Sequence, residues 1–300
     1  MSTCRSSRSC GNPLHPPALF RHAFLLSFVL AAAAASGAEV PLRYDHGYIT
    51  QDTTWSGTVI LHGQTVVKRG STLTILPGTV VKFEWIDEDG DEIGDGELTV
   101  EGRLVAKGTK ERFITFTSAR ENPRMKDWTY LQASVNKDSV IEYCRFEYAF
   151  SGIQVHYSTA TIRNCLFRNN FEGIRFSTTD VRIENNDIVD NYYGIRCEAH
   201  GSRTVITKNR FSGNEFAFFP VQRNWDSVKI YGNNFEGSAG YDVKFGINQK
   251  QDMDFTKNWW GTSDPREIAA KIYDGEREGT LGRVRFVPFL AERVEGCGIR

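Results

Sequence analysis

Cationic side chains recur at one place in the second half of the chain, directly after a Gly-Ile pair. Arg175 follows Gly173-Ile174, Arg196 follows Gly194-Ile195, and Lys244 takes the matching place after a shift of one residue. If the isoleucine of each pair faces the core, the next side chain faces solvent, because side chains alternate along a strand. The three cations are therefore expected in one outward row, where they could hold hydroxyl or acid groups by charge-assisted hydrogen bonds.

Four further side chains flank this row by the same counting. Two of them precede a Gly-Ile pair, and two lie two strand positions beyond the row. An aromatic ring beside cations suits a sugar, whose apolar face lies on the ring while its polar groups meet the charge. The predicted contact residues for a polysaccharide or other glycan are Arg175, Arg196, Lys244, Tyr193, Glu172, Glu198 and His156.

Two alternatives stay open for this face. Cations stacked about 4.8 Å apart repel each other unless anions neutralise them. Glu172 and Glu198 could neutralise them within the protein, and an acidic glycan could do so instead. The neighbouring aromatic column of Phe150, Phe171 and Tyr192 could also be an internal stack.

Catalytic residues are unknown from the sequence. Glycoside hydrolysis normally requires two carboxylates roughly 5–10 Å apart. The nearest pair, Asp187 and Asp190, falls in an Asn-rich turn where short polar residues are expected for backbone reasons. We therefore expect a protein that binds or scaffolds on polysaccharide. The alternatives are a lyase, hydrolase or epimerase acting on acidic glycans, and a purely structural surface or adhesion module.

No metal and no cofactor is expected. The acidic segment 87–95 has the carboxylate spacing of a calcium loop, but Glu92 stands where such a loop needs Gly, and Leu98 stands where it needs a bidentate Glu. We interpret it as a solvated loop. His46, His62 and His200 each precede a glycine without the partner residues of a known motif, and they are assigned no role.

The elements that must position these side chains follow from a repeat. Its spacings are 21, 21, 23, 24 and 25 residues, and each unit holds short period-two strands separated by Asn and Gly. Such a unit cannot bury its apolar face alone, so stacked units must supply the core of a solenoid. The units open at Ile141, Ile162, Ile183, Ile206, Ile230 and Phe255.

The fourth position of each unit forms a column of short polar residues and thiols. In stacked parallel strands, equivalent positions lie about 4.8 Å apart, so asparagine amides there can form a ladder. A disulfide between the first two members and a pair of buried thiols both remain open. The column contains Cys144, Cys165, Asn186, Asn209, Asn233 and Asn258.

The I-x-N-N-x-I and G-I-x-Φ rhythm, with Φ an apolar residue, resembles the right-handed parallel β-helix repeats of bacterial exported proteins. This is the group of carbohydrate-binding proteins and sugar hydrolases with the pectate-lyase fold, also called pectin-lyase-like. Residues 71–83, 258–265 and 282–290 resemble the same group. The resemblance implies an all-β chain, folded as a single-stranded right-handed parallel β-helix with caps at both ends. It implies no activity, because such a fold hosts binders and enzymes alike.

Four segments are expected along the chain. Residues 1–38 read as a secretory signal peptide, with three arginines before an apolar run that ends in Ser36-Gly37-Ala38. Residues 39–130 are expected to form the N-terminal cap and first irregular coils, and residues 131–260 the regular coils. Residues 261–300 are expected to form a C-terminal cap, with a short helix at 264–273 and a closing strand at 283–290.

Location and partners follow from the charge. Without its first 38 residues the chain keeps 33 basic and 37 acidic residues, a net charge of −4. There is no polybasic field to attract nucleic acid or an anionic membrane surface. We expect a secreted, periplasmic or cell-surface monomer that binds no nucleic acid and keeps no membrane span after signal cleavage.

Overall fold

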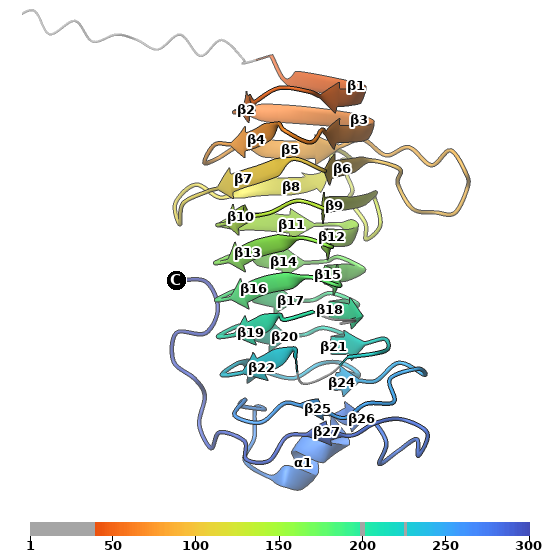
Figure 1. Cartoon of the computed structure of the whole chain (residues 1–300), viewed down its shortest axis with the longest axis vertical. Helices are drawn as coiled ribbons and strands as arrows, with labels where there is room; N and C mark the ends of the chain where they lie inside the picture. The colour runs from red at the N-terminus through yellow and green to blue at the C-terminus, as the bar shows by residue number, and fades with distance from the viewer. Residues whose placement is uncertain (1–39, 199–201, 225–226) are drawn as a thin grey trace, which may run out of the picture. The chain divides into compact units, whose positions relative to one another are not determined.

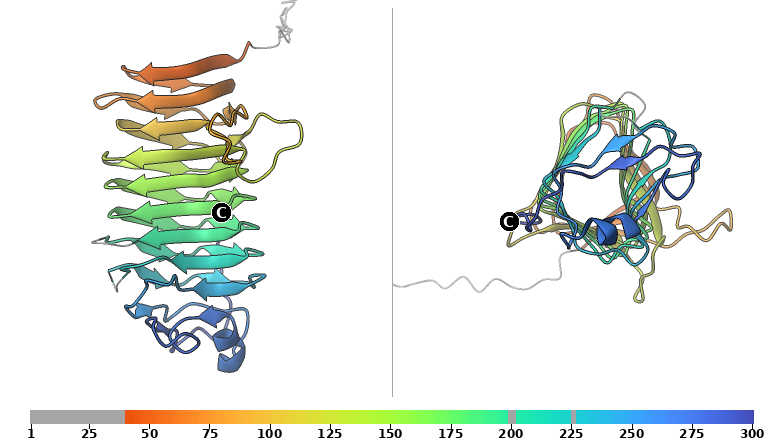
Figure 2. Two further views of the ribbon diagram at one scale, coloured as in Figure 1. Left: turned by 90° about the vertical axis from the view of Figure 1, so that its right-hand side faces the viewer. Right: turned by 90° about the horizontal axis from the view of Figure 1, so that it is seen from below.

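The computed structural model describes residues 40–198, 202–224 and 227–300. The predicted signal peptide and His200 lie outside the described residues. These described residues belong to one compact unit and contain 27 strands and one short helix. The strands lie on three faces around a central core, and each coil of the chain contributes to these faces in turn (Figures 1 and 2).

Face 1 is an eight-stranded sheet. It contains β2 (Thr53–Trp55), β4 (Thr72–Ile75), β7 (Arg103–Lys107), β10 (Ser139–Glu142), β13 (Thr159–Arg163), β16 (Asp180–Glu184), β19 (Val205–Thr207) and β22 (Lys229–Tyr231).

Faces 2 and 3 belong to one 17-stranded sheet, because β1 (Leu42–Ile49) and the long strand β3 (Thr58–Val67) join them at one end. Face 2 contains β5 (Val80–Phe83), β8 (Ile114–Ser118), β11 (Cys144–Glu147), β14 (Leu166–Arg168), β17 (Asp187–Val189), β20 (Arg210–Ser212) and β23 (Asn234–Phe235). Face 3 contains β6 (Glu97–Val100), β9 (Trp128–Ser134), β12 (Ala149–His156), β15 (Glu172–Ser177), β18 (Tyr193–Glu198), β21 (Phe216–Pro220), β24 (Tyr241–Lys244) and β26 (Ile272–Tyr273).

Neighbouring coils pair in parallel, in the register that the repeat predicts. Ile141 lies opposite Ile162, which lies opposite Ile183, and the row continues through Ile206 to Ile230. Each strand therefore turns equivalent side chains to the same side. The predicted all-β, right-handed parallel β-helix is confirmed.

Apolar side chains fill the interior in stacked rows. Phe146 lies between Phe116 and Phe167, with ring centroids 4.8 Å apart on either side. Phe83 stacks on Trp128 with ring centroids 4.1 Å apart, so the aromatic packing extends into the less regular first coils. Each fully buried aromatic side chain stabilises the fold by roughly 1.5–3 kcal/mol relative to an exposed one.

The predicted asparagine ladder is present and fully buried. The side-chain oxygen of Asn209 accepts from the backbone N–H and the side-chain amide of Asn186, at 3.0 and 2.9 Å. Asn209 donates in turn to Asn233, and Asn233 donates to Asn258, each at 3.0 Å. These bonds satisfy the polar groups of the tight turn between face 1 and face 2, which would otherwise be buried without partners.

A second ladder lies in the turn between face 2 and face 3. The amide of Asn170 donates to Asn191, and the amide of Asn191 donates to Asn214, both at 3.0 Å. This second column was not predicted from the sequence. Its members lie two residues before Glu172 and Tyr193, and so fix the start of these face 3 strands.

Cys144 and Cys165 are free, buried thiols rather than a disulfide. The Cys165 thiol donates to the carbonyl of Arg163 at 3.1 Å, and its sulfur accepts the backbone N–H of Cys144 at 3.4 Å. Burial raises the pKa of the Cys144 thiol well above its ordinary value. The two residues therefore continue the asparagine column with weaker hydrogen-bonding groups.

The C-terminal part differs in two respects from the prediction. Residues 272 and 273, expected in the helix, form β26 instead. A short helix, α1 (Pro265–Ala270), begins as expected, with the Asp264 side chain accepting the backbone N–H of Arg266. The closing strand expected at 283–290 is wrong in extent. Only β27 (Val284–Arg285) forms a strand there and pairs with β25 (Met253–Asp254), while residues 286–290 continue without strand pairing.

The acidic segment 87–95 lies in a long loop between β5 and β6. Its carboxylates bind the backbone of the loop itself: Asp87 accepts from Gly90 and Glu92, and Asp91 accepts from Ile93. Figure 1 shows this loop projecting to the side of the stack.

Candidate functional site

The structure brings the predicted cationic row together on face 3. Arg175 lies directly opposite Arg196 in the β15–β18 pair. Arg196 lies opposite Phe219 in β21, and Lys244 follows one coil further, opposite Tyr273 in β26. The row is therefore continuous across four coils, although one aromatic residue interrupts the cations.

Glu172 neutralises the two arginines from within the protein. Its buried carboxylate accepts from Arg196 Nη1 at 3.0 Å and lies 3.9 Å from Arg175 Nη1. Ser151 also donates to this carboxylate. Burial lowers the pKa of Arg175, and the nearby Arg196 adds to the effect while Glu172 opposes it. Of the two alternatives, the geometry therefore favours neutralisation of Arg175 and Arg196 by a carboxylate of the protein over neutralisation by an acidic glycan.

His156 and Glu198 lie in the next outward column of face 3. The His156 ring contacts Ser177 Oγ at 2.7 Å and Gln154 Oε1 at 3.0 Å. Since Gln154 Oε1 only accepts, Nε2 carries the proton and Nδ1 accepts from Ser177. Burial, and then the charge of Arg175, lower the pKa of His156 to about 4. Its neutral imidazole has both nitrogens occupied. Glu198 accepts a hydrogen bond from Gln222 at 3.2 Å.

The aromatic column beside the row lies at the surface and is not an internal stack. Phe150, Phe171 and Tyr192 stack with centroids 5.2 and 5.0 Å apart, and Tyr192 is 37% exposed. Tyr193 connects this column to the row, because its ring stacks on Phe219 at 4.6 Å.

A cleft of about 470 Å³ opens at the C-terminal end of the row. Phe219, Tyr241 and Tyr273 supply aromatic walls, Lys244 supplies a cation, and Glu278 supplies a carboxylate. The Lys244 ammonium lies 4.3 Å from the centroid of the Phe216 ring. Among the described residues, no carboxylate forms an ion pair with Lys244. The sequence predicted Lys244 but not Tyr241 or Tyr273, which come from less regular coils.

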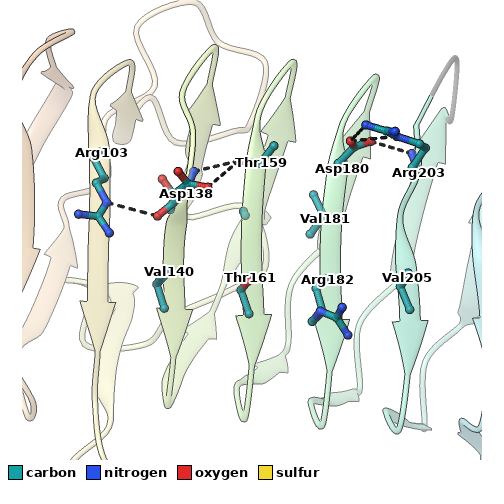
Figure 3. A pocket seen from close by; sticks show the side chains of 12 residues that line it. Arg103, Asp138, Val140, Thr159, Thr161, Asp180, Val181, Arg182, Arg203 and Val205 are labelled. Carbon is teal, nitrogen blue, oxygen red and sulfur yellow. Dashed lines mark hydrogen bonds and ion pairs between the residues drawn. The ribbon is translucent and has the colours of Figure 1, made fainter.

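A second, shallow hollow of about 530 Å³ lies on face 1 (Figure 3). Arg203 pairs with Asp180 at 2.6 Å, and Arg103 donates to the backbone carbonyl of Asp138 at 3.4 Å. Arg203 and Asp180 thus neutralise each other within the hollow.

The nearest carboxylate pair of the sequence analysis lies away from the row. Asp187 belongs to β17 on face 2 and forms an ion pair with Arg210 at 2.8 Å. Asp190 sits in the following turn with a left-handed φ of 56°. The structure therefore brings neither residue to the candidate face.

One cluster was missed by sequence reasoning. Donor atoms of Asp45, His46 and His62 all lie within 4.8 Å of one another at the N-terminal end of the stack. The two His-Gly pairs were visible in the sequence, but their sixteen-residue separation matches no ligand spacing that would have indicated a site. Asp87, Asp89 and Asp91 form a second such group, made of loop carboxylates alone.

The comparisons with known proteins give one match. A family model described as "Periplasmic copper-binding protein (NosD)" matches residues 115–275, more than half of the chain. No curated protein and no solved structure matches. In the part of the chain that the structure describes, no helix is long and apolar enough to cross a membrane. The predicted location outside the cytoplasm agrees with the periplasmic description of the family. This chain belongs to the NosD family of periplasmic parallel β-helix proteins.

Proposed function

We propose that this chain is a periplasmic binding protein that holds an acidic saccharide on face 3, at the cleft formed by Phe219, Tyr241, Lys244 and Tyr273. The observation that carries the proposal is the meeting of three aromatic walls with an ammonium that no described carboxylate pairs. A pyranose ring has an apolar face that can lie on an aromatic ring, and a uronic acid adds a carboxylate for the cation.

Arg175 and Arg196 are expected to contribute less to saccharide binding than Lys244. Glu172 already accepts from Arg196 and lies near Arg175, so a ligand carboxylate there would compete with a buried partner. Lys244 forms no ion pair with a described carboxylate, although Glu278 also lines the cleft, and its ammonium lies against the Phe216 ring. The saccharide is therefore expected to be anchored at Lys244, with Tyr193 and Arg196 extending the surface toward the N-terminus.

The test is binding of oligouronides by isothermal titration calorimetry at low salt. Lys244→Ala and Tyr273→Ala should each weaken binding about tenfold, roughly 1.4 kcal/mol. Lys229→Ala, an exposed lysine on face 1, should leave it unchanged. Binding should also weaken with added salt, because exposed charge contacts are screened.

Two outcomes would contradict the proposal. If both cleft variants bind as tightly as the unaltered protein, the saccharide does not occupy the cleft. If no acidic glycan binds saturably, the structural or adhesion alternative replaces the proposal. New reducing ends, or an unsaturated product absorbing in the near ultraviolet, would favour the enzyme alternative.

Copper binding is a second candidate function, favoured by the description of the family whose model matches. Within the matched residues 115–275 the donors fit poorly. The thiols of Cys144, Cys165 and Cys197 are buried, and burial raises the pKa of Cys144 and Cys197 well above the ordinary value. The described residues of this span also contain no group of three close His, Cys, Asp or Glu donors. A copper site would therefore have to lie elsewhere in the chain.

A further inference from the structure

We propose that Asp45, His46 and His62 form a copper(II) site at the N-terminal end of the β-helix, with Glu84 as its supporting carboxylate. The inference rests on the copper-binding candidate function and gives it a location. Each of the three residues offers a donor atom, and these atoms lie within 4.8 Å of one another. A single ion between them could contact all three after small side-chain rotations.

An irregularity in the β1–β3 pair brings adjacent residues to one side. Asp45 lies opposite His62, and Gly47 lies opposite Thr65, so β1 advances two residues where β3 advances three. In a regular strand Asp45 and His46 would point to opposite faces. The irregularity instead lets His46, at a left-handed φ of 41°, turn its ring toward His62, with centroids 5.8 Å apart.

Gly63 makes this approach possible. A Cβ atom at position 63 would lie 2.1 Å from Cε1 of the His46 ring, closer than any real contact allows. The residue also has a positive φ of 68°, which glycine adopts without strain. The backbone is thus shaped so that the His46 ring lies over it, beside His62.

His62 has the supporting contact that metal-bound histidines typically have. Its Nδ1 lies 2.9 Å from Glu84 Oε2, so Nδ1 carries the proton and Nε2 keeps a free lone pair. Carboxylates in this position fix the tautomer and orientation of a ligating ring. Glu84 is itself held by Arg43, which donates to both of its oxygens at 2.7 Å.

The donor set indicates which metal it would take. Two imidazoles and one carboxylate suit divalent copper or zinc, and copper(II) is the tightest-binding divalent ion of the first transition series. Copper(I) prefers sulfur donors, and the sulfurs of Cys144 and Cys165 are buried, several coils away. Asp87, Asp89 and Asp91 of the 87–95 loop offer oxygen donors alone, so we assign no copper site to them.

The site lies outside the matched residues 115–275. It would therefore be a property of the first coils of this chain, whatever the matched coils bind.

The test is titration of the untagged chain with copper(II) chloride against a competing chelator, followed by electron paramagnetic resonance. We expect one tight copper(II) per chain, with splitting from nitrogen ligands. His46→Ala and His62→Ala should each lower the affinity at least tenfold, and Asp45→Ala should lower it less. Glu84→Gln should lower it about tenfold while leaving the stoichiometry unchanged. Asp89→Asn, at an exposed loop carboxylate, is the matched control and should bind like the unaltered protein.

Three results would overturn the assignment. Unchanged binding in the His46→Ala, His62→Ala double variant would remove this site but leave copper binding by the protein intact. Absence of copper binding by the unaltered chain would remove both the site and the candidate function. Tighter binding of zinc than of copper at the same residues would overturn the choice of metal. Circular dichroism of each variant distinguishes lost ligands from lost folding, and Asp45→Ala alters only an exposed side chain.

Discussion

Asn209 shows how single side chains hold the turns of this protein. It is fully buried, accepts from Asn186, and donates to Asn233 and to the backbone carbonyls of Ile183 and Thr207. Every one of its polar atoms therefore has a partner in an adjacent coil or in its own turn. Removing the amide would leave buried groups above and below it unpaired, which costs more than the bonds contribute net.

We therefore expect Asn209→Ala to lower the free energy of unfolding by about 1–3 kcal/mol. The measurement is urea denaturation followed by circular dichroism. Asn248→Ala, at an exposed asparagine, is the control and should change stability by less than about 0.5 kcal/mol. Equal effects of the two substitutions would show that the ladder does not stabilise the fold.

His156 gives a prediction on pH dependence. Burial lowers its pKa to about 4, whereas an unfolded histidine titrates near 6.5. Between these values the unfolded chain binds one more proton, so the contribution of His156 is present above about pH 6.5 and is lost as the pH falls toward 4. Titration by nuclear magnetic resonance should give a midpoint near 4, and His156→Gln should flatten the dependence of stability on pH in this window. A midpoint near 6.5 would contradict the buried, neutral ring.

At the scale of the elements, the glycines of face 3 lie where the next coil leaves no room for a side chain. A Cβ atom added at Gly173 would lie 2.7 Å from the backbone oxygen of Gly194, and Gly152 has the same contact with Gly173. Because the contacting atoms are backbone of the next coil, they cannot move aside without disturbing the parallel ladder. The recurring glycine is thus a packing requirement of the stack.

Gly173→Ala is accordingly expected to destabilise the protein by about 1–3 kcal/mol, the usual cost of overpacking. Differential scanning calorimetry should show a lower unfolding temperature. Gly279→Ala is the control, because a Cβ there meets nothing within 4 Å. A Gly173→Ala protein as stable as the control would mean that adjacent coils can separate at little cost.

At the scale of the whole described unit, the C-terminal tail connects distant coils. Figure 1 shows residues 291–300 running back along the stack from its C-terminal end. Val294 exchanges two hydrogen bonds with the side chain of Asn234, each at 3.0 Å, and Gly298 donates to Lys208 at 2.9 Å. Tyr143 donates to the carbonyl of Arg300 at 3.1 Å, although the two residues are 157 positions apart.

Deletion of residues 291–300 should lower the thermal midpoint by about 2–8 °C, which corresponds to roughly 1–2 kcal/mol for a chain of this size. The far-ultraviolet circular dichroism of β-strands should remain, because no strand is removed. Deleting only residues 299 and 300 should have a smaller effect. If the longer deletion leaves the midpoint unchanged, the tail is a passive extension.

The sequence determined the repeating part of this protein. The spacing of the opening isoleucines, the asparagine column and the outward placement of Arg175, Arg196 and Lys244 were all readable from it. These features depend on alternation along a strand and on a register that repeats once per coil. The helix at Pro265 was predictable for a similar reason, since its capping residue lies directly before it. Each of these signals is either local or repeated at a fixed interval.

Contacts between positions that are not equivalent in the repeat were decided only by the tertiary structure. Glu172 neutralises Arg196 because its side chain is buried between coils, and the sequence left that choice open. Tyr273 reaches the cleft from a coil beyond the regular repeat. His46 meets His62 because the β1–β3 pair slips at Gly63. These three contacts depend on irregular strand pairing and on loops of unequal length. Neither can be predicted from the pattern of residue types in the sequence.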